Sequence, residues 1–487
     1  MENSKNNFRK FLRDMSIVFS TDIFLKLKAF IIIPIITRMM GVTNFGLWTQ
    51  INAFVTLLIT ILMIGIPAAL IRFLPGKDKE EFDNDLVMMF TILLSSLILG
   101  CLVIYIFKDI ILKIVFDNNI GVISIYLAML LIVSRSLKTF IQIYYRSILA
   151  VKYYSLSIII ESFVGLSLLA TFINIELSIN SIIYSFIATD ILIVIIGVVK
   201  ILKSVEIRRP NFERKSIYLR FSILTLPIAI SNWINNSIDR FFIGYFLGTF
   251  QMGLYSAAYS ISSMVISIIA SPLWIVFPTM INNLWNAGEE DKAKRLIERA
   301  IIYQLVVLVP IGFAFAFFGK PLFVLYLSNS FEESFILVGF IVVSYIFYMT
   351  SAFFETSINL IRKPEFVLVN YMGCSVFNII LNLILIRWIG TIGAAITTLL
   401  TMMSLCVLNY IRANREMNIK IKNFDVIKIF SIAGIVFPVF TIFFVGNLRS
   451  MVLMSLISIT VYILLILKFK VISYNEVRFL KKSIMNK

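Results

Sequence analysis

The sequence predicts an all-α, polytopic membrane protein with about fourteen transmembrane helices, and three observations support this class. Hydrophobic residues make up 60% of the 487 residues and charged residues only 15%, with a mean hydropathy of +0.95. Soluble domains average about 25% charged residues, so this composition excludes them. Apolar stretches of the ~20 residues that a helix needs to cross a bilayer recur from Asp14 to Lys470. They are continuous rather than alternating, which excludes lipid-facing barrel strands.

The predicted spans follow one another with short polar connections. The first six are 14–38, 44–71, 84–107, 120–145, 153–173 and 178–199. The next six are 221–247, 252–285, 300–318, 334–361, 365–386 and 390–411, and a last pair is 429–447 and 450–467. Several exceed a minimal crossing, so we expect tilted or kinked helices.

Two longer polar connections divide these spans into six, six and two. We therefore expect an N-terminal lobe at 1–202, a cytoplasmic linker at 203–220, a C-terminal lobe at 221–412, and an accessory helix pair with a basic tail at 413–487. Each lobe has an even number of crossings, so two repeated lobes would share one orientation.

Local sequence echoes predict that the two lobes are pseudo-symmetric. Gly41–Trp48 after the first span parallels Gly248–Tyr255 after the seventh, at a distance of 207 residues. Ser147-Ile148 likewise parallels Ser357-Ile358. Such repeats place a substrate path between the lobes. The alternative is that glycine-rich turns between helices resemble one another by chance.

Basic residues are distributed asymmetrically between the two ends of the predicted spans. Of the 44 lysines and arginines, thirty-three lie on the side of the N-terminus, six on the other side and five inside spans. This distribution predicts cytoplasmic termini. It also explains the net charge of +17 by topology and contact with anionic membrane lipids, so we expect no nucleic-acid partner.

Signatures of catalysis and cofactor binding are absent from the sequence. It contains no histidine, which excludes histidine-based catalysis, metal ligation and proton relays. It has no GxxxxGK[ST] loop, and its three cysteines lie in separate apolar spans. We expect a transporter without a catalytic residue, metal site or cofactor.

Positive charges inside a bilayer cost free energy, so lysine and arginine in a membrane span usually have a function. The five buried cations therefore predict a cavity for an anion: Lys26, Lys28, Arg135, Lys138 and Arg240. Arginine and lysine suit phosphate, whereas amides and phenols suit sugar hydroxyls. Candidate cavity-lining residues of the second kind are Gln142, Asn232, Asn235, Asn236, Tyr345 and Tyr348.

Acidic residues inside the spans have two interpretations. Asp22, Asp239 and Glu355 are candidates for coupling to H⁺ or Na⁺, but Asp22 with Lys26 and Asp239 with Arg240 could equally be neutralising pairs. Glu161 and Asp190 stand more isolated in sequence. Each is either a structural helix–helix contact or a functional group.

Three segments carry a resemblance to a known family: Phe30–Trp48, Asp239–Gly248 and Gly253–Tyr259. They resemble the polysaccharide-transport flippases of the MOP exporter superfamily, which include O-antigen and capsule repeat-unit flippases. The resemblance covers essentially the whole chain in length and layout.

This resemblance implies two six-helix lobes around a central cavity that opens alternately to each side. It implies passage of an undecaprenyl-pyrophosphate-linked oligosaccharide from the cytoplasmic to the outer leaflet of a bacterial cytoplasmic membrane, in surface polysaccharide biosynthesis. The five buried cations would engage the pyrophosphate. The final helix pair resembles the accessory helices of lipid II flippases, where a groove can hold the lipid tail.

Three alternatives remain at this point. A lipid II flippase shares the fourteen-span layout. A MATE-type ion-coupled antiporter shares the lobes, although about twelve spans and an acidic cavity would be more natural there. A membrane oligosaccharide polymerase or ligase would need a large outer loop, for which no outward segment has room.

Overall fold

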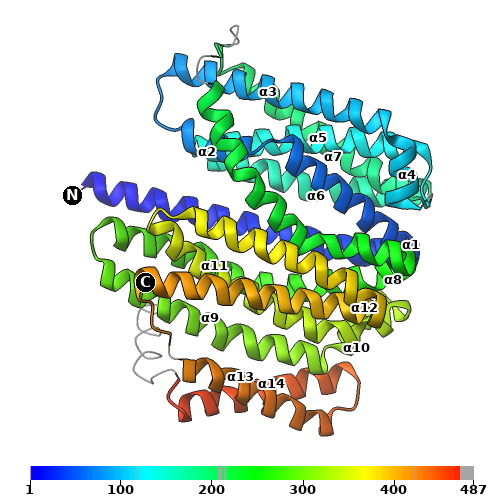
Figure 1. Ribbon diagram of the computed structural model, residues 1–487, viewed down its shortest axis with the longest axis vertical. Coiled ribbons are helices and arrows are strands. Elements are labelled where there is room, and N and C mark those ends of the chain that lie inside the picture. The colour runs from blue at the N-terminus through cyan, green and yellow to red at the C-terminus, as the bar shows by residue number, and fades with distance from the viewer. Residues whose placement is uncertain (1, 118, 207–210, 213–214, 422, 472–487) are drawn as a thin grey trace. The chain divides into compact units, whose positions relative to one another are not determined.

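The computed structural model is helical, which confirms the predicted all-α class (Figure 1). It describes residues 2–117, 119–206, 211–212, 215–421 and 423–471, without the side chains of residues 2–20, Asp22, Lys215, Ile275 and Asn423. No β-strand occurs among these described residues.

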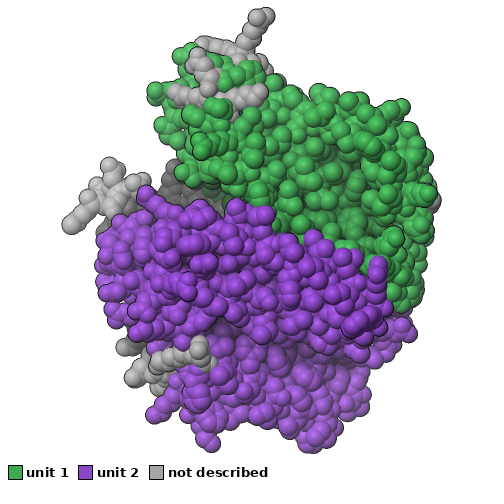
Figure 2. Space-filling model, viewed as in Figure 1, with its two compact units in different colours: residues 1–253 green, residues 254–487 purple. Residues whose placement is uncertain are grey.

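The chain divides into two compact units, residues 1–253 and 254–487, which are coloured separately in Figure 2. Unit 1 holds α1 (Glu2–Leu62), α2 (Ile66–Phe73), α3 (Lys79–Ile106), α4 (Lys108–Phe116), α5 (Val122–Ser147), α6 (Val151–Ile175), α7 (Ile179–Leu202) and the first part of α8 (Lys215–Asn286). Unit 2 holds the rest of α8, then α9 (Glu290–Phe318), α10 (Lys320–Leu327), η1 (Asn329–Leu337), α11 (Val338–Leu360), α12 (Pro364–Met417), α13 (Asn423–Phe440), η2 (Thr441–Phe443) and α14 (Leu448–Lys468). The domain boundaries expected from the sequence stay a prediction.

Three long helices each contain a kink, at Gly41 in α1, Gly248 in α8 and Ile389–Gly390 in α12. Ten helices among the described residues are long and apolar enough to cross a membrane, or eleven when α1 and the bent α2 count as one span. Dividing α1, α8 and α12 at their kinks raises these eleven to fourteen apolar segments among the described residues, the number that the sequence predicts. The chain is therefore a multi-pass membrane protein.

The kinks in α1 and α8 share one backbone geometry. Gly41 has φ 75° and ψ −177°, and Gly248 has φ 82° and ψ 174°. This region of backbone space is essentially restricted to glycine. The two glycines open the two segments whose sequences echo each other, so the sequence repeat has a counterpart in backbone conformation.

Gly46 and Gly253, which follow these kinks by five residues, allow a close approach within unit 1. A Cβ on Gly46 would lie 2.1 Å from the carbonyl oxygen of Thr249, and a Cβ on Gly253 would lie 2.1 Å from that of Val42. Val42 and Thr249 are the residues that follow the two kink glycines. The contact is therefore reciprocal, and it is possible because both positions lack a side chain.

Two consecutive side chains of α3 hold the connection between α7 and α8 and the first turn of α8. Asn84 bonds both the backbone N–H and the carbonyl of Asn211, at 2.6 and 3.3 Å. Asp85 is buried and accepts a hydrogen bond from the hydroxyl of Tyr218 at 2.7 Å. The described part of this connection thus follows the surface of unit 1.

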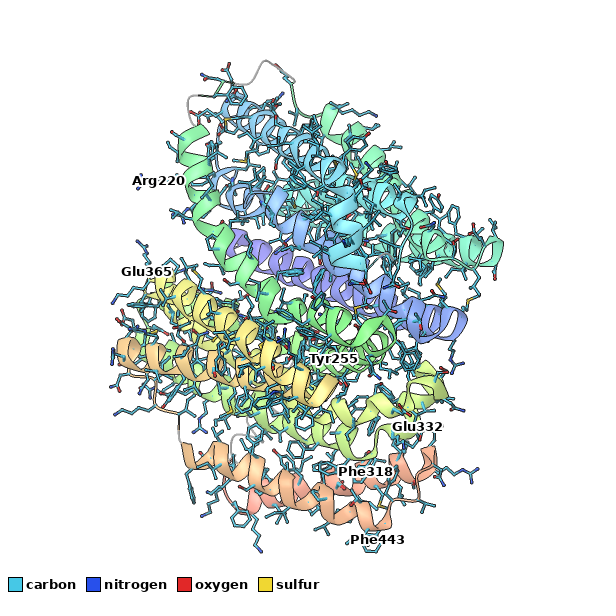
Figure 3. All side chains as sticks on the ribbon, turned by 45° about the vertical axis from the view of Figure 1, so that its right-hand side comes forward. Arg220, Tyr255, Phe318, Glu332, Glu365 and Phe443 are labelled. Atoms are coloured by element: carbon cyan, nitrogen blue, oxygen red, sulfur yellow. The ribbon has the colours of Figure 1, made fainter. Side chains whose placement is uncertain are left out.

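In unit 2, α13 and α14 lie side by side and both contact α9 (Figure 1). Phe318, labelled in Figure 3, ends α9 and lies with its ring centroid 6.2 Å from that of Phe437 in α13 and 5.5 Å from that of Phe444. Such aromatic pairs bury large apolar areas. The last helix pair is therefore joined to unit 2 by apolar packing.

Candidate functional site

Three of the five cations predicted inside the spans converge in the interior of unit 1. Lys28 comes from the first segment of α1, and Arg135 and Lys138 come from α5. Two carboxylates lie between them, Glu161 of α6 and Asp190 of α7. We call these five residues the charged cluster.

Both lysines of the charged cluster are paired. Oε1 of Glu161 lies 2.9 Å from Nζ of Lys28 and 3.0 Å from Nζ of Lys138, and Oδ1 of Asp190 lies 2.6 Å from Nζ of Lys138. Lys28, Lys138 and Asp190 are only 8%, 6% and 1% exposed. Mutual pairing is what makes such buried charges tolerable, because an uncompensated one would be strongly destabilising.

Arg135 is the least firmly paired cation of the cluster. Its Nε lies 3.5 Å from Oδ2 of Asp190, and one terminal amino group donates to Oδ1 of Asn52 at 3.0 Å. A guanidinium carries five N–H donors, so donors remain for an incoming anion. Arg135 is therefore the strongest candidate for an anion anchor in unit 1.

Two stacked aromatic rings lie beside Lys28 and Arg135. The ring of Phe186 stacks on that of Trp48, with centroids 5.2 Å apart. Nζ of Lys28 lies 5.6 Å and Cζ of Arg135 lies 5.3 Å from the centroid of Phe186. Cations favour the face of an aromatic ring, so Phe186 helps to position both side chains without neutralising their charge.

Helical spacing brings these residues together. Arg135, Lys138 and Gln142 are three and four residues apart and so share one face of α5. Gln142 donates from Nε2 to Oε2 of Glu161 at 3.1 Å. Gly165, one turn after Glu161, packs beside Lys28, whose Cε would be in ordinary van der Waals contact with a Cβ at that position, at 3.7 Å.

The formal charge of the cluster is net positive, because three cations face two carboxylates. The carboxylates occupy the positions that the oxygens of an anionic ligand would need at the two lysines. Charge-assisted hydrogen bonds of this kind are similar for carboxylate and phosphate oxygens. The donors of the two lysines therefore suit phosphate oxygens as well as carboxylate oxygens.

Arg240 belongs to a separate polar group on α8. It donates to the carbonyl oxygen of Asn236 at 2.7 Å and lies 3.4 Å from Oδ1 of Asp239. Asn236 in turn donates to Oδ1 of Asn232 at 3.0 Å. Asn235 is 2% exposed, and its amide makes no hydrogen bond with a described residue. The contacts above do not join this group to the charged cluster.

The two remaining candidates of α1, Lys26 and Asp22, are not part of the charged cluster as described. Lys26 is half-buried and, being two residues from Lys28, lies on another side of the helix. The side chain of Asp22 lies outside the described residues.

The candidates from the second half of the chain lie in unit 2. The ring centroid of Tyr345 is 5.9 Å from that of Tyr348 and 5.6 Å from that of Tyr259. Glu355 accepts a hydrogen bond from the hydroxyl of Tyr371 at 2.8 Å. No described cation pairs with this carboxylate.

The sequence alone does not place Glu161 and Asp190 in the site, although its pattern of charged residues points to them. Each is the one acidic residue of its predicted span, and the span at 120–145, which directly precedes that of Glu161, carries two cations. Opposite charges in adjacent membrane helices are expected to pair. Asn52 and Phe186, in contrast, are ordinary helix residues and have no comparable signal.

The comparison with protein families shows to which family this chain belongs. Residues 11–284, which include the whole charged cluster, match the model of a family described as polysaccharide biosynthesis protein. The chain belongs to this family. The resemblance to the polysaccharide-transport flippases of the MOP exporter superfamily is thereby confirmed. Residues 224–384 also match the MatE family model.

Two relatives of this polysaccharide biosynthesis family member come from Haloferax volcanii. The probable low-salt glycan biosynthesis flippase Agl15 is 21% identical over 223 residues, which are 46% of each chain. The probable flippase AglR is 26% identical over 254 residues, which are 50% of each chain. The matched part of the chain thus spans about half the length of these relatives.

Two solved structures share the fold of this family member. A lipid II flippase MurJ in an inward closed conformation superposes with a TM-score of 0.75 at 17% identity, covering 92% of this chain and 98% of that one. An inward-facing multidrug resistance MATE family transporter gives 0.59 at 14% identity, covering 80% and 98%. These matches are a flippase and a transporter rather than enzymes, in agreement with the predicted class.

Proposed function

We propose that this protein is a flippase that moves undecaprenyl-pyrophosphate-linked oligosaccharide repeat units from the cytoplasmic to the outer leaflet by alternating access, in surface polysaccharide biosynthesis. The observation that carries the proposal is the buried, net positive charged cluster of unit 1. Membership of the polysaccharide biosynthesis family supports it. In this proposal the protein is a transporter of the bacterial cytoplasmic membrane, with both termini cytoplasmic.

The chemistry of the cargo fits the charged cluster. A polyprenyl tail can stay in the lipid, but a pyrophosphate and its sugars cannot cross hydrocarbon without losing their hydration at a high cost. In the proposed mechanism Arg135 contacts the pyrophosphate first, through donors that its present partners leave unused. Lys28 and Lys138 then exchange their carboxylates for phosphate oxygens, while Glu161 and Asp190 serve as internal counter-ions in the empty protein.

The other candidates have secondary roles in this proposal. Lys26 and Arg240 are further contacts for the pyrophosphate. Amide and phenol groups would hydrogen-bond the sugar hydroxyls of the cargo, and these are Gln142, Asn232, Asn235, Asn236, Tyr345 and Tyr348. Three acidic residues are candidates for coupling to H⁺ or Na⁺, and these are Asp22, Asp239 and Glu355.

A second candidate is a lipid II flippase, because the TM-score of 0.75 to such a protein extends over 92% of the chain. Both candidates carry a polyprenyl pyrophosphate, so both use the charged cluster in the same way. They differ in the sugar that follows the pyrophosphate.

Leaflet transfer in proteoliposomes tests the proposal. Arg135→Gln should lower the rate of transfer of a fluorescent undecaprenyl-pyrophosphate oligosaccharide at least about tenfold, since it removes a charge-assisted anchor of roughly 1.5–3 kcal/mol. Arg449→Gln removes the same charge from the exposed first turn of α14 and should leave the rate unchanged. Equal rates for Arg135→Gln and the unchanged protein would refute the site. Transfer of lipid II alone would favour the second candidate, and transfer of cationic dyes alone would favour an antiporter.

A further inference from the structure

A cleft opens at one end of unit 1, where α5 ends, α6 begins and α7 ends. Its lining includes Ile141, Tyr145, Tyr153, Leu156, Ile196 and Lys200. None of its lining residues belongs to the charged cluster. The cleft is therefore a second place at which a ligand could meet unit 1.

The cation of this cleft is held by an aromatic ring instead of a carboxylate. Nζ of Lys200 lies 3.5 Å from the ring centroid of Tyr153. No carboxylate among the described residues lies within ion-pair distance of Lys200, in contrast to Lys28 and Lys138. A cation on an aromatic face keeps its charge and can still bind an anion from the open side.

A buried hydroxyl in the same cleft also lacks a partner. Tyr145 is 5% exposed, and its hydroxyl forms no hydrogen bond with a described residue. Leaving a buried donor unsatisfied is costly. A ligand oxygen in the cleft would satisfy it.

The opening of the cleft is apolar. Leu156 and Ile196 are 42% and 39% exposed, and exposed apolar side chains in a membrane span face lipid. Lys200 lies in the last turn of α7. Polarity along the cleft therefore runs from a cation at the helix end, past two phenols, to aliphatic side chains deeper in the span.

We propose that this cleft binds an anionic phospholipid. The phosphate lies at Lys200, an ester oxygen accepts a hydrogen bond from Tyr145, and an acyl chain runs along Leu156 and Ile196. Basic pockets between transmembrane helices recognise anionic headgroups in this way. At the same end of unit 1, Cζ of Arg146 lies 5.7 Å from the ring centroid of Tyr154. This is a second cation beside an aromatic ring.

Native mass spectrometry of the purified full chain tests the proposal, with phosphatidylglycerol and phosphatidylcholine as probes. The unchanged protein should retain phosphatidylglycerol preferentially. Lys200→Gln should weaken that binding about fivefold, because a lysine near an anionic headgroup contributes ~1 kcal/mol. Tyr145→Phe preserves the packing and should weaken binding of both lipids, because the ester is common to both.

Lys113→Gln is the matched control, since Lys113 is an exposed lysine of α4 outside the cleft. It should leave the preference for phosphatidylglycerol unchanged. Equal retention of the two lipids by the unchanged protein would overturn the proposal. An undiminished preference in Lys200→Gln would do the same, as would equal losses in Lys200→Gln and Lys113→Gln.

Discussion

Replacing Glu161 with glutamine should lower the free energy of unfolding by about 3–5 kcal/mol, the typical cost of removing one partner from a buried ion pair. Glu161 bonds both Lys28 and Lys138 and accepts from Gln142. The neutral amide would leave Lys28 without a carboxylate and would raise the net positive charge of the cluster. Thermal unfolding of the purified protein in detergent measures this loss.

Glu176→Gln is the matched control, because Glu176 is an exposed residue just beyond the end of the same helix, α6. It should leave the melting temperature unchanged. Inorganic pyrophosphate at millimolar concentration should recover part of the stability of Glu161→Gln, since its oxygens can replace the lost carboxylate at the lysines. Equal melting temperatures for the two variants would mean that Glu161 does not compensate the lysines.

Adding a single methyl group at Gly46 should also be strongly destabilising, by about 3 kcal/mol. The new Cβ would lie 2.1 Å from the carbonyl oxygen of Thr249, so two helix backbones would have to separate. Gly253→Ala should cost about as much, because its Cβ would meet the carbonyl oxygen of Val42 at the same distance. Thermal unfolding of both alanine variants, compared with the unchanged protein, measures the effect.

Gly373→Ala is a control for the effect of replacing a helical glycine. Nothing lies within 4 Å of a Cβ at Gly373, on an exposed face of α12. This substitution should be neutral or stabilising by up to about 1 kcal/mol, because alanine is the better helix former. A loss at Gly46 no greater than the change at Gly373 would contradict the reciprocal contact.

The class and the spans of this protein could be predicted from the sequence because bilayer thickness and hydropathy constrain them directly. The positions of two kinks could be predicted from the sequence as well. Gly41 and Gly248 stand at the predicted connections after the first and seventh spans, and at each of them one helical segment passes into the next through a single residue with non-helical backbone angles. Sequence predicts where a membrane segment ends more readily than how the backbone turns there.

The candidate site was less predictable because charge pairing between helices depends on their packing. Spacing along one helix places Arg135, Lys138 and Gln142 on a common face. It cannot show that Lys28 reaches Glu161, 133 residues later in the chain. A sequence pattern therefore identified the cations and missed that carboxylates neutralise most of their charge.

The central claim is that the charged cluster exchanges internal carboxylates for the pyrophosphate of its cargo, and a binding measurement tests it most directly. The equilibrium dissociation constant of a fluorescent short-chain polyprenyl pyrophosphate would be compared among the unchanged protein, Arg135→Gln and Glu161→Gln, below the melting temperature of each. The account predicts changes of opposite sign. Arg135→Gln loses an anchor and binds more weakly, whereas Glu161→Gln loses a competitor for the lysines and binds more tightly. Unchanged affinity in both variants, or weaker binding in both, would contradict the exchange.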